Sequence, residues 1–150
     1  MKTKNFGWTG LALIASIIMI FSFSSCTYKT HFLTSSVVPA AQGTVQIKID
    51  ANKNYVIKIK LSNLAPSTRL SPPKEAYVVW LVTVGKVAKN LGKLNSTTNF
   101  MSKNLDASFE TVSGLKPVKI IITAENDVNV QYSTFSDLIL TTDYMKIKDR

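Results

Sequence analysis

Apolar and polar residues alternate over two neighbouring stretches of the chain, residues 45–50 and 55–62. Apolar side chains hold the odd positions in both stretches, and polar side chains hold nearly all the even positions. A period of two with one apolar face is typical of a half-buried strand. The intervening Asn52-Lys53-Asn54 has the composition of a hairpin turn. These stretches therefore predict an antiparallel hairpin with a three-residue loop.

Lysines are concentrated on the polar face of this predicted hairpin. If the apolar positions share a face, Lys48 can lie opposite Lys58, and Gln46 can lie opposite Lys60. Like charges directly opposite each other are mildly destabilising, so their presence needs a reason. One reason is that charged residues protect a solvated sheet edge against aggregation. The other is that Lys48, Lys58 and Lys60 form a face that binds an anionic ligand, and the sequence leaves both explanations open.

Further strands are predicted along the rest of the chain. Residues 76–84 are apolar at both odd and even positions and are rich in residues that favour strands. This pattern predicts a central strand covered on both faces. Trp80 within this strand is expected to pack in the core. Residues 63–75 hold three prolines and cannot form a central strand, so we interpret them as a connector. The remaining strands are expected over residues 86–94, 107–112, 118–125 and 138–142.

About seven strands separated by turn signals, with no helix predicted after residue 25, indicate an all-β protein. The expected fold is an antiparallel two-sheet sandwich occupying residues 44–144. Residues 145–150 are expected to form a charged tail.

The first 26 residues have the pattern of an export signal. Two lysines within the first four residues precede an apolar run over residues 11–23, which ends at Ser24-Ser25-Cys26. A basic start, an apolar core and small residues before a cleavage site are typical of a secretory signal peptide. The two serines followed by the single cysteine of the chain resemble the lipobox of bacterial lipoproteins. This resemblance implies that residues 1–25 are removed and that Cys26 becomes the lipidated first residue of the mature protein.

An uncleaved membrane helix is the alternative interpretation of this segment. Residues 6–23 would span about 27 Å as a helix, close to the hydrocarbon thickness of a bilayer. Both interpretations place the remainder outside the cytoplasm. Residues 26–43 are rich in Ser and Thr and predict a flexible tether. Because no acidic residue directly follows Cys26, we expect attachment to the outer membrane, facing the periplasm.

Charge narrows the range of expected partners. Removing residues 1–25 leaves 16 basic and nine acidic side chains, a formal charge of about +7. This balance favours anionic lipid headgroups or acidic polysaccharide, and export argues against nucleic acid as a partner. Since no second cysteine is present, no disulfide is expected.

The inventory of reactive side chains argues against conventional catalysis. The chain has one histidine, His31 in the expected tether, and Cys26 is expected to be acylated. Hydrolytic, zinc and blue-copper sites need imidazole or thiolate groups held together. We therefore expect no enzyme activity, no metal and no cofactor. A carboxylate pair such as Glu110 with Glu125 is left open as a glycosidase arrangement, and residues 125–129 are interpreted as a polar turn rather than a calcium site.

Part of the chain resembles the extracytoplasmic C-terminal domain of anti-sigma-K-type factors and related envelope lipoproteins. The matching segments lie between residues 76 and 144 and are Tyr77–Val82, Asn90–Leu94, Ile122–Glu125 and Leu138–Thr142. The resemblance implies an immunoglobulin-like or cupredoxin-like sandwich. Those factors also carry a cytoplasmic sigma-binding module with a His/Cys zinc pattern. Here five residues precede the apolar segment 6–23, so the resemblance implies architecture and location but not regulation.

Together these features predict a non-catalytic, lipid-anchored cell-envelope protein whose sandwich has a structural or interaction role. Its expected partners are the membrane, through the N-terminal lipid, and an envelope protein or anionic polymer. Two alternatives stay open. One is a binding module for an anionic glycan or lipid, and the other is an extracytoplasmic sensing partner of a signalling system.

Overall fold

Strands form nearly all the regular structure in the computed structural model, which describes residues 27–97, 105–132 and 135–148. The predicted signal segment 1–25 and Cys26 lie outside the described residues. One short 3-10 helix, η1 (Ser67–Arg69), is present in this part of the chain. The nine strands found there are β1 (Thr27–His31), β2 (Gln42–Ile49), β3 (Tyr55–Ser62), β4 (Ala76–Val82), β5 (Ala88–Lys93), β6 (Asn95–Thr97), β7 (Asp106–Ser113), β8 (Lys119–Glu125) and β9 (Leu138–Thr141).

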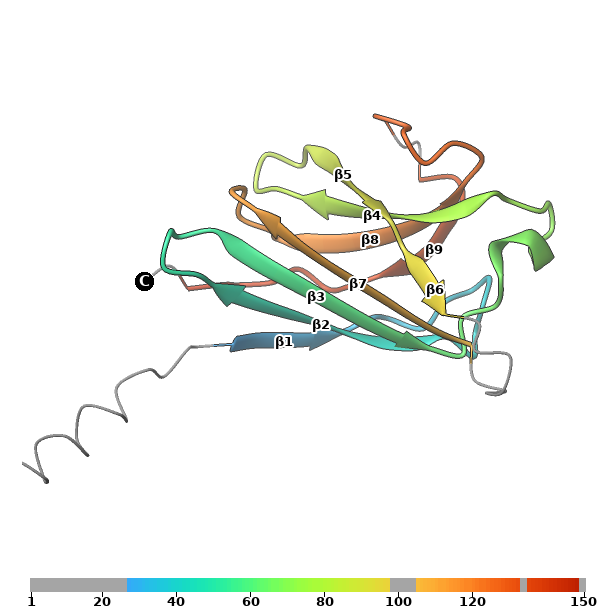
Figure 1. Cartoon of the computed structure of the whole chain (residues 1–150), viewed down its shortest axis with the longest axis horizontal. Coiled ribbons are helices and arrows are strands. Elements are labelled where there is room, and N and C mark those ends of the chain that lie inside the picture. The colour runs from blue at the N-terminus through green and yellow to red at the C-terminus, as the bar shows by residue number, and fades with distance from the viewer. Residues whose placement is uncertain (1–26, 98–104, 133–134, 149–150) are drawn as a thin grey trace, which may run out of the picture.

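The strands build two antiparallel sheets that lie face to face (Figure 1). One sheet has the order β1-β2-β3-β7-β6, and the other has the order β5-β4-β8-β9. Without β1, these orders correspond to strands A-B-E-D and C′-C-F-G of an immunoglobulin-type sandwich. The predicted all-β sandwich is confirmed, and its strand order is the immunoglobulin-like one. The connector over residues 63–75 crosses between the sheets, as expected from its prolines.

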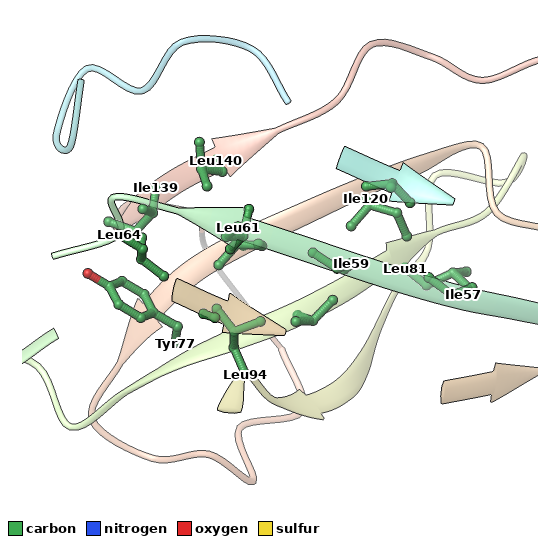
Figure 2. Close-up of a cluster of buried hydrophobic side chains, with 14 of the residues drawn as sticks. Ile57, Ile59, Leu61, Leu64, Tyr77, Leu81, Leu94, Ile120, Ile139 and Leu140 are labelled. Carbon is green, nitrogen blue, oxygen red and sulfur yellow. The ribbon is translucent and has the colours of Figure 1, made fainter. Parts of the chain in front are cut away.

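The main core lies between the two sheets. Each strand contributes alternate side chains to it because successive residues of a strand point to opposite faces. From β3 come Ile57, Ile59 and Leu61, which belong to the same buried cluster as Leu81 of β4 and Ile120 of β8 (Figure 2). Fully burying one such side chain stabilises the fold by about 1.5–3 kcal/mol. The odd-numbered apolar pattern of the sequence is therefore the inward face of the five-stranded sheet.

A second apolar cluster covers the outer face of the four-stranded sheet. It contains Trp80, which is fully buried, together with Val78, Val82 and Ile121. The loop that joins β8 to β9 closes over this cluster, and the ring of Phe135 meets Trp80 edge-on at 6.3 Å between centroids. All seven residues of β4 are consequently buried, as the sequence predicted. Trp80 does pack in a core, although in this outer cluster rather than between the sheets.

The β2–β3 hairpin is confirmed, but its register differs from the predicted one by two residues. Lys58 lies opposite Gln46 and not opposite Lys48, which faces Val56. The predicted pairing of one lysine with another was therefore wrong.

The turn explains this register. The carboxylate of Asp50 accepts hydrogen bonds of 2.8 Å from the backbone N–H groups of Asn52 and Asn54. Lys53 takes a positive φ of 63°, which closes a three-residue loop over residues 51–53. An aspartate that bonds to the backbone two residues ahead is a strong turn former, so the side chain of Asp50 sets the pairing of the strands that follow.

Edge protection does not explain the lysines of this hairpin. β2 lies between β1 and β3, and β3 lies between β2 and β7. Both strands are interior, and the edges of their sheet are β1 and β6. The edge-protection explanation was therefore wrong, because the sequence did not reveal that β1 pairs with β2.

The predicted tether is part of the sandwich. β1 pairs with β2 along its whole length, and Tyr28 and Phe32 pack against the main core. Farther along, Val38 is buried, and its N–H donates to the hydroxyl of Ser35 at 2.9 Å. Aromatic side chains spaced among threonines and lysines supply enough apolar surface for an edge strand. The structure thus corrects the tether expected over residues 26–43.

The predicted charged tail also packs on the sandwich. Met145 and Ile147 are buried members of the main core, whereas Lys146 and Lys148 are exposed. This alternation brings the segment against the start of β8, where the N–H of Met145 donates to the carbonyl of Val118 at 2.7 Å. Among the described residues, no helix has the length and apolar composition needed to cross a bilayer.

Candidate functional site

The three lysines of the predicted anionic-ligand face all lie on the outer face of the five-stranded sheet. Lys48 is on β2, and Lys58 and Lys60 are on β3. Lys58 forms an ion pair with Glu110 of β7, at 2.8 Å between Nζ and Oε1. Both side chains are about half exposed, so the pair adds little stability but offsets the charge of Lys58. Lys48 and Lys60 lie four residues apart along the sheet, about 13 Å.

An open pocket of about 590 Å³ lies at one end of this face. Among its lining residues are His31, Thr44, Lys60 and Ser108, which form one row across β1, β2, β3 and β7. His31 and Ser108 are three strand spacings apart, about 14 Å, so they cannot act as a hydrogen-bonded base and nucleophile. The pocket offers one imidazole, one ammonium, one carboxylate from Asp106, one amide and hydroxyl groups to a polar ligand. Sequence reasoning missed it because His31 was assigned to a tether.

The two carboxylates considered as a glycosidase pair are far apart. Glu110 projects from the outer face of the five-stranded sheet, where it reaches Lys58. Glu125 lies on the outer face of the other sheet, where it accepts a hydrogen bond of 2.6 Å from Thr123. Two packed sheets about 10 Å apart separate these outward-facing groups. They share no cleft, so this arrangement does not support glycoside hydrolysis.

The segment over residues 125–129 is a polar turn. Asp127 accepts a hydrogen bond of 2.9 Å from the backbone N–H of Asn129, which is a local turn contact. Within the described ranges, no group of three or more His, Cys, Asp or Glu side chains could hold a metal ion.

Trp80 belongs to a chain of hydrogen bonds that links three side chains. Its indole N–H donates to the hydroxyl of Thr123 at 2.8 Å, and that hydroxyl donates to the carboxylate of Glu125 at 2.6 Å. A buried indole N–H needs such an acceptor. The arrangement supports a packing role for Trp80 rather than ring stacking on a ligand.

A cavity of about 240 Å³ lies beside η1. The phenol of Tyr77 donates a hydrogen bond of 2.7 Å to the carbonyl of Ala65 there, and burial raises the pKa of Tyr77 to about 12. Glu75, Lys93 and Asp106 add charge to its lining. The lining residues come from separate segments of the chain, so no local sequence signal indicates the cavity.

A third pocket, of about 260 Å³, lies at the start of β1. Tyr28, Ile47, Ile49 and Ile147 give it an apolar lining. Thr27, Lys146 and Lys148 complete it. Thr27 directly follows Cys26 in the sequence, so this pocket lies next to the predicted site of lipidation.

No protein-family model, curated protein or solved structure matches the chain. The resemblance to anti-sigma-K-type factors and the lipobox assignment of Cys26 stay predictions. Function is therefore inferred from the residues and their geometry.

Proposed function

We propose that the protein is a non-catalytic, lipid-anchored component of a cell envelope, and that its sandwich is an interaction module held at a membrane surface. The apolar run over residues 11–23 and the small residues before Cys26 support export and lipidation. The structural observation that carries the proposal is that β1 begins at Thr27.

The position of β1 leaves no room for a flexible tether between Cys26 and the sandwich. Consecutive Cα atoms are about 3.8 Å apart, so a lipid on Cys26 is attached within one residue of the folded sheet. Three acyl chains would hold the protein stably, whereas one chain alone binds only marginally. The sandwich is then confined to a thin layer at the membrane, which raises its effective concentration for membrane neighbours.

The described chemistry supports binding rather than catalysis. His31 lies about 14 Å from Ser108, too far for a hydrogen bond between them. The carboxylates of Glu110 and Glu125 lie on opposite outer faces of the sandwich. Exposed polar sheet faces and the pocket beside His31 are surfaces that a partner can contact. A role as an extracytoplasmic sensing partner is compatible with this module but depends on the family resemblance.

A second candidate is an anionic-ligand module that uses Lys48, Lys58 and Lys60. It is favoured by the pocket that places Lys60 among hydroxyl groups. Changing all three lysines to glutamine should then lower retention on an anionic matrix at low salt. Unchanged retention would remove this candidate and leave the anchored interaction module in place.

The anchor is tested by labelling growing cells with a fatty acid and fractionating their membranes. We expect the wild-type chain to carry label and to lie in the membrane fraction. Cys26→Ser should abolish the label and leave a longer, unprocessed chain. Ser24→Ala keeps a small side chain near the cleavage site and is the matched control, expected to behave as wild type. An unlabelled wild-type chain in the cytosol would contradict the proposal.

Partners of the module are best sought by crosslinking in intact cells, followed by purification from solubilised membranes. We expect an envelope protein or anionic polymer to co-purify with the wild-type chain. Its loss from Cys26→Ser would show that the contact depends on the anchor.

A further inference from the structure

The two ends of the sandwich differ in composition. We define the Thr27 end as the end that holds the start of β1, the turns over residues 50–54, 83–87 and 114–118, and the segment 143–148 (Figure 1). Backbone hydrogen bonds hold some of these parts together: the N–H of Met145 donates to the carbonyl of Val118 at 2.7 Å, and the N–H of Val118 donates to the carbonyl of Val82, next to the turn over residues 83–87, at 2.8 Å. The opposite end holds η1 and is called the η1 end.

Charge is distributed unevenly between the ends. Lysines 53, 86, 116, 146 and 148 lie in the turns and final segment of the Thr27 end, and lysines 48, 89 and 119 lie on strand residues just behind them. Within the described part of the chain, the acids of this end are Asp50 and Asp143. The carboxylate of Asp50 already accepts three hydrogen bonds in its own turn. The Thr27 end is therefore strongly cationic.

The η1 end has the opposite balance. Among the residues that the structure describes, its basic residues are Lys60, Arg69, Lys74 and Lys93, and Lys74 is paired with Asp137 at 2.7 Å. Its acids in the described ranges are Glu75, Asp106, Glu125, Asp127 and Asp137. Cationic attraction is thus a property of one end and not of the whole surface.

Large apolar side chains project from two adjacent turns of the Thr27 end. Val84 and Val87 are 76% and 65% exposed in the turn between β4 and β5, and Leu115 is 43% exposed in the turn between β7 and β8. Lys86 and Lys116 lie beside them in the same turns. Scattered exposed apolar residues are ordinary, but apolar tips bordered by lysines are typical of surfaces that enter the headgroup layer of a membrane.

We propose that the Thr27 end docks onto an anionic lipid bilayer. Val84, Val87 and Leu115 enter the headgroup layer, and the surrounding lysines contact lipid phosphates. This inference rests on the proposed function, since the lipid on Cys26 holds the Thr27 end beside the bilayer. A weak contact is then sufficient, because the anchor supplies a high effective concentration.

Docking fixes the orientation of the module. With the Thr27 end on the bilayer, η1 and the cavity beside Tyr77 face away from the membrane. Each lysine near an anionic surface strengthens attraction by roughly fivefold, so the contact depends on lipid charge and on salt.

The experiment uses the full chain, purified from membranes and reconstituted into phosphatidylcholine vesicles with or without phosphatidylglycerol. Because the native sequence has one cysteine and acylation blocks its thiol, an introduced cysteine is the reactive one. Val84→Cys carries an environment-sensitive dye at the Thr27 end, and Thr68→Cys carries it on exposed η1. We expect a blue shift and protection from a water-soluble quencher at position 84 in phosphatidylglycerol vesicles. The dye at position 68 should stay exposed to water under the same conditions.

The contribution of lysine charge is tested with matched double variants in the Val84→Cys background. Changing Lys53 and Lys86 to glutamine should lower the ratio of docked to undocked protein by about twenty-five-fold, at roughly fivefold per lysine. Changing Arg69 and Lys93 to glutamine removes the same charge from the η1 end and should leave the ratio unchanged.

Each other outcome overturns the proposal in a distinct way. If the dye at position 84 stays as exposed to water as the dye at position 68 in anchored protein, docking is excluded. Equal losses in the two double variants assign the effect to net charge and not to this end. A response to soluble anionic polysaccharide but not to vesicles makes the end a polymer site. The mass of the N-terminal peptide from the same sample reports Cys26 separately, so a missing lipid refutes the proposed function and not the docking surface.

Discussion

The indole N–H of Trp80 donates a 2.8 Å hydrogen bond to the hydroxyl of Thr123, and both residues are fully buried. This contact joins β4 to β8 on the outer face of the four-stranded sheet. It also explains why a threonine occurs within the otherwise apolar run Ile120–Ala124. The buried hydroxyl satisfies a donor that apolar packing alone would leave without an acceptor.

Thr123→Val should therefore destabilise the protein by about 1–3 kcal/mol, because the substitution keeps the shape but leaves the indole N–H without its acceptor. Urea unfolding followed by tryptophan fluorescence is the measurement. After loss of residues 1–25, Trp80 is the one tryptophan left, so the signal reports this site directly. Thr68→Val on exposed η1 is the control, expected within about 0.5 kcal/mol of wild type. Equal stabilities for the two variants would contradict this role of Thr123.

Gly43→Ala should destabilise the sandwich by about 1–3 kcal/mol through overpacking. A Cβ at Gly43 would overlap the side chain of Leu61 and would lie 2.7 Å from the carbonyl oxygen of Lys60. Gly85→Ala is the matched control, since its added Cβ would come no closer than 3.9 Å to the hydroxyl of Thr83. Thermal unfolding of both variants should separate them, and a Gly43→Ala protein as stable as Gly85→Ala would show that the two strands can move apart.

Ionisation of Tyr77 should lower the free energy of unfolding at high pH. Its pKa is raised by burial from 10.0 to about 12, so the folded state favours the neutral phenol. The resulting stabilisation is fully present below pH 10, where both states are protonated. It is lost as pH rises from about 10 to about 12, because the unfolded chain ionises first. Urea unfolding across this range should show a loss of about 2–3 kcal/mol. Tyr77→Phe should remove this part of the pH dependence, and an identical slope in the variant would assign it to other groups.

Ile147→Ala should cost about 2–4 kcal/mol, because the side chain is a buried part of the main core. Lys148→Ala, one residue away and exposed, should have little effect on the free energy of unfolding. Equal unfolding midpoints for the two variants would indicate that this segment is the free charged tail expected from its sequence.

Sequence patterns predicted the features that depend on local periodicity. The alternation around Ile47 and Ile57 identified β2 and β3, and the continuous apolar run around Val79 identified a strand buried on both faces. Patterns did not reveal β1, where Tyr28 and Phe32 are spaced among polar residues. The hairpin register was wrong because it is set by one side chain, the carboxylate of Asp50, and not by the alternation.

The candidate surfaces were harder to predict because they are assembled from distant segments. His31, Lys60 and Ser108 enter one row only after β1, β3 and β7 have joined one sheet. The cationic, apolar-tipped Thr27 end combines turns that are 30 or more residues apart in sequence, such as those of Lys53, Lys86 and Lys116. The composition of any one of these turns does not indicate that they lie together. Their grouping follows from the strand order alone.

The most direct test of the central claim is the mass of the N-terminal peptide of the protein extracted from cell membranes. The account predicts a peptide that begins at Cys26, with a diacylglycerol on its sulfur and an acyl group on its new amine, followed at once by the residues of β1. A chain that still begins at Met1, with the thiol of Cys26 unmodified, would contradict the account.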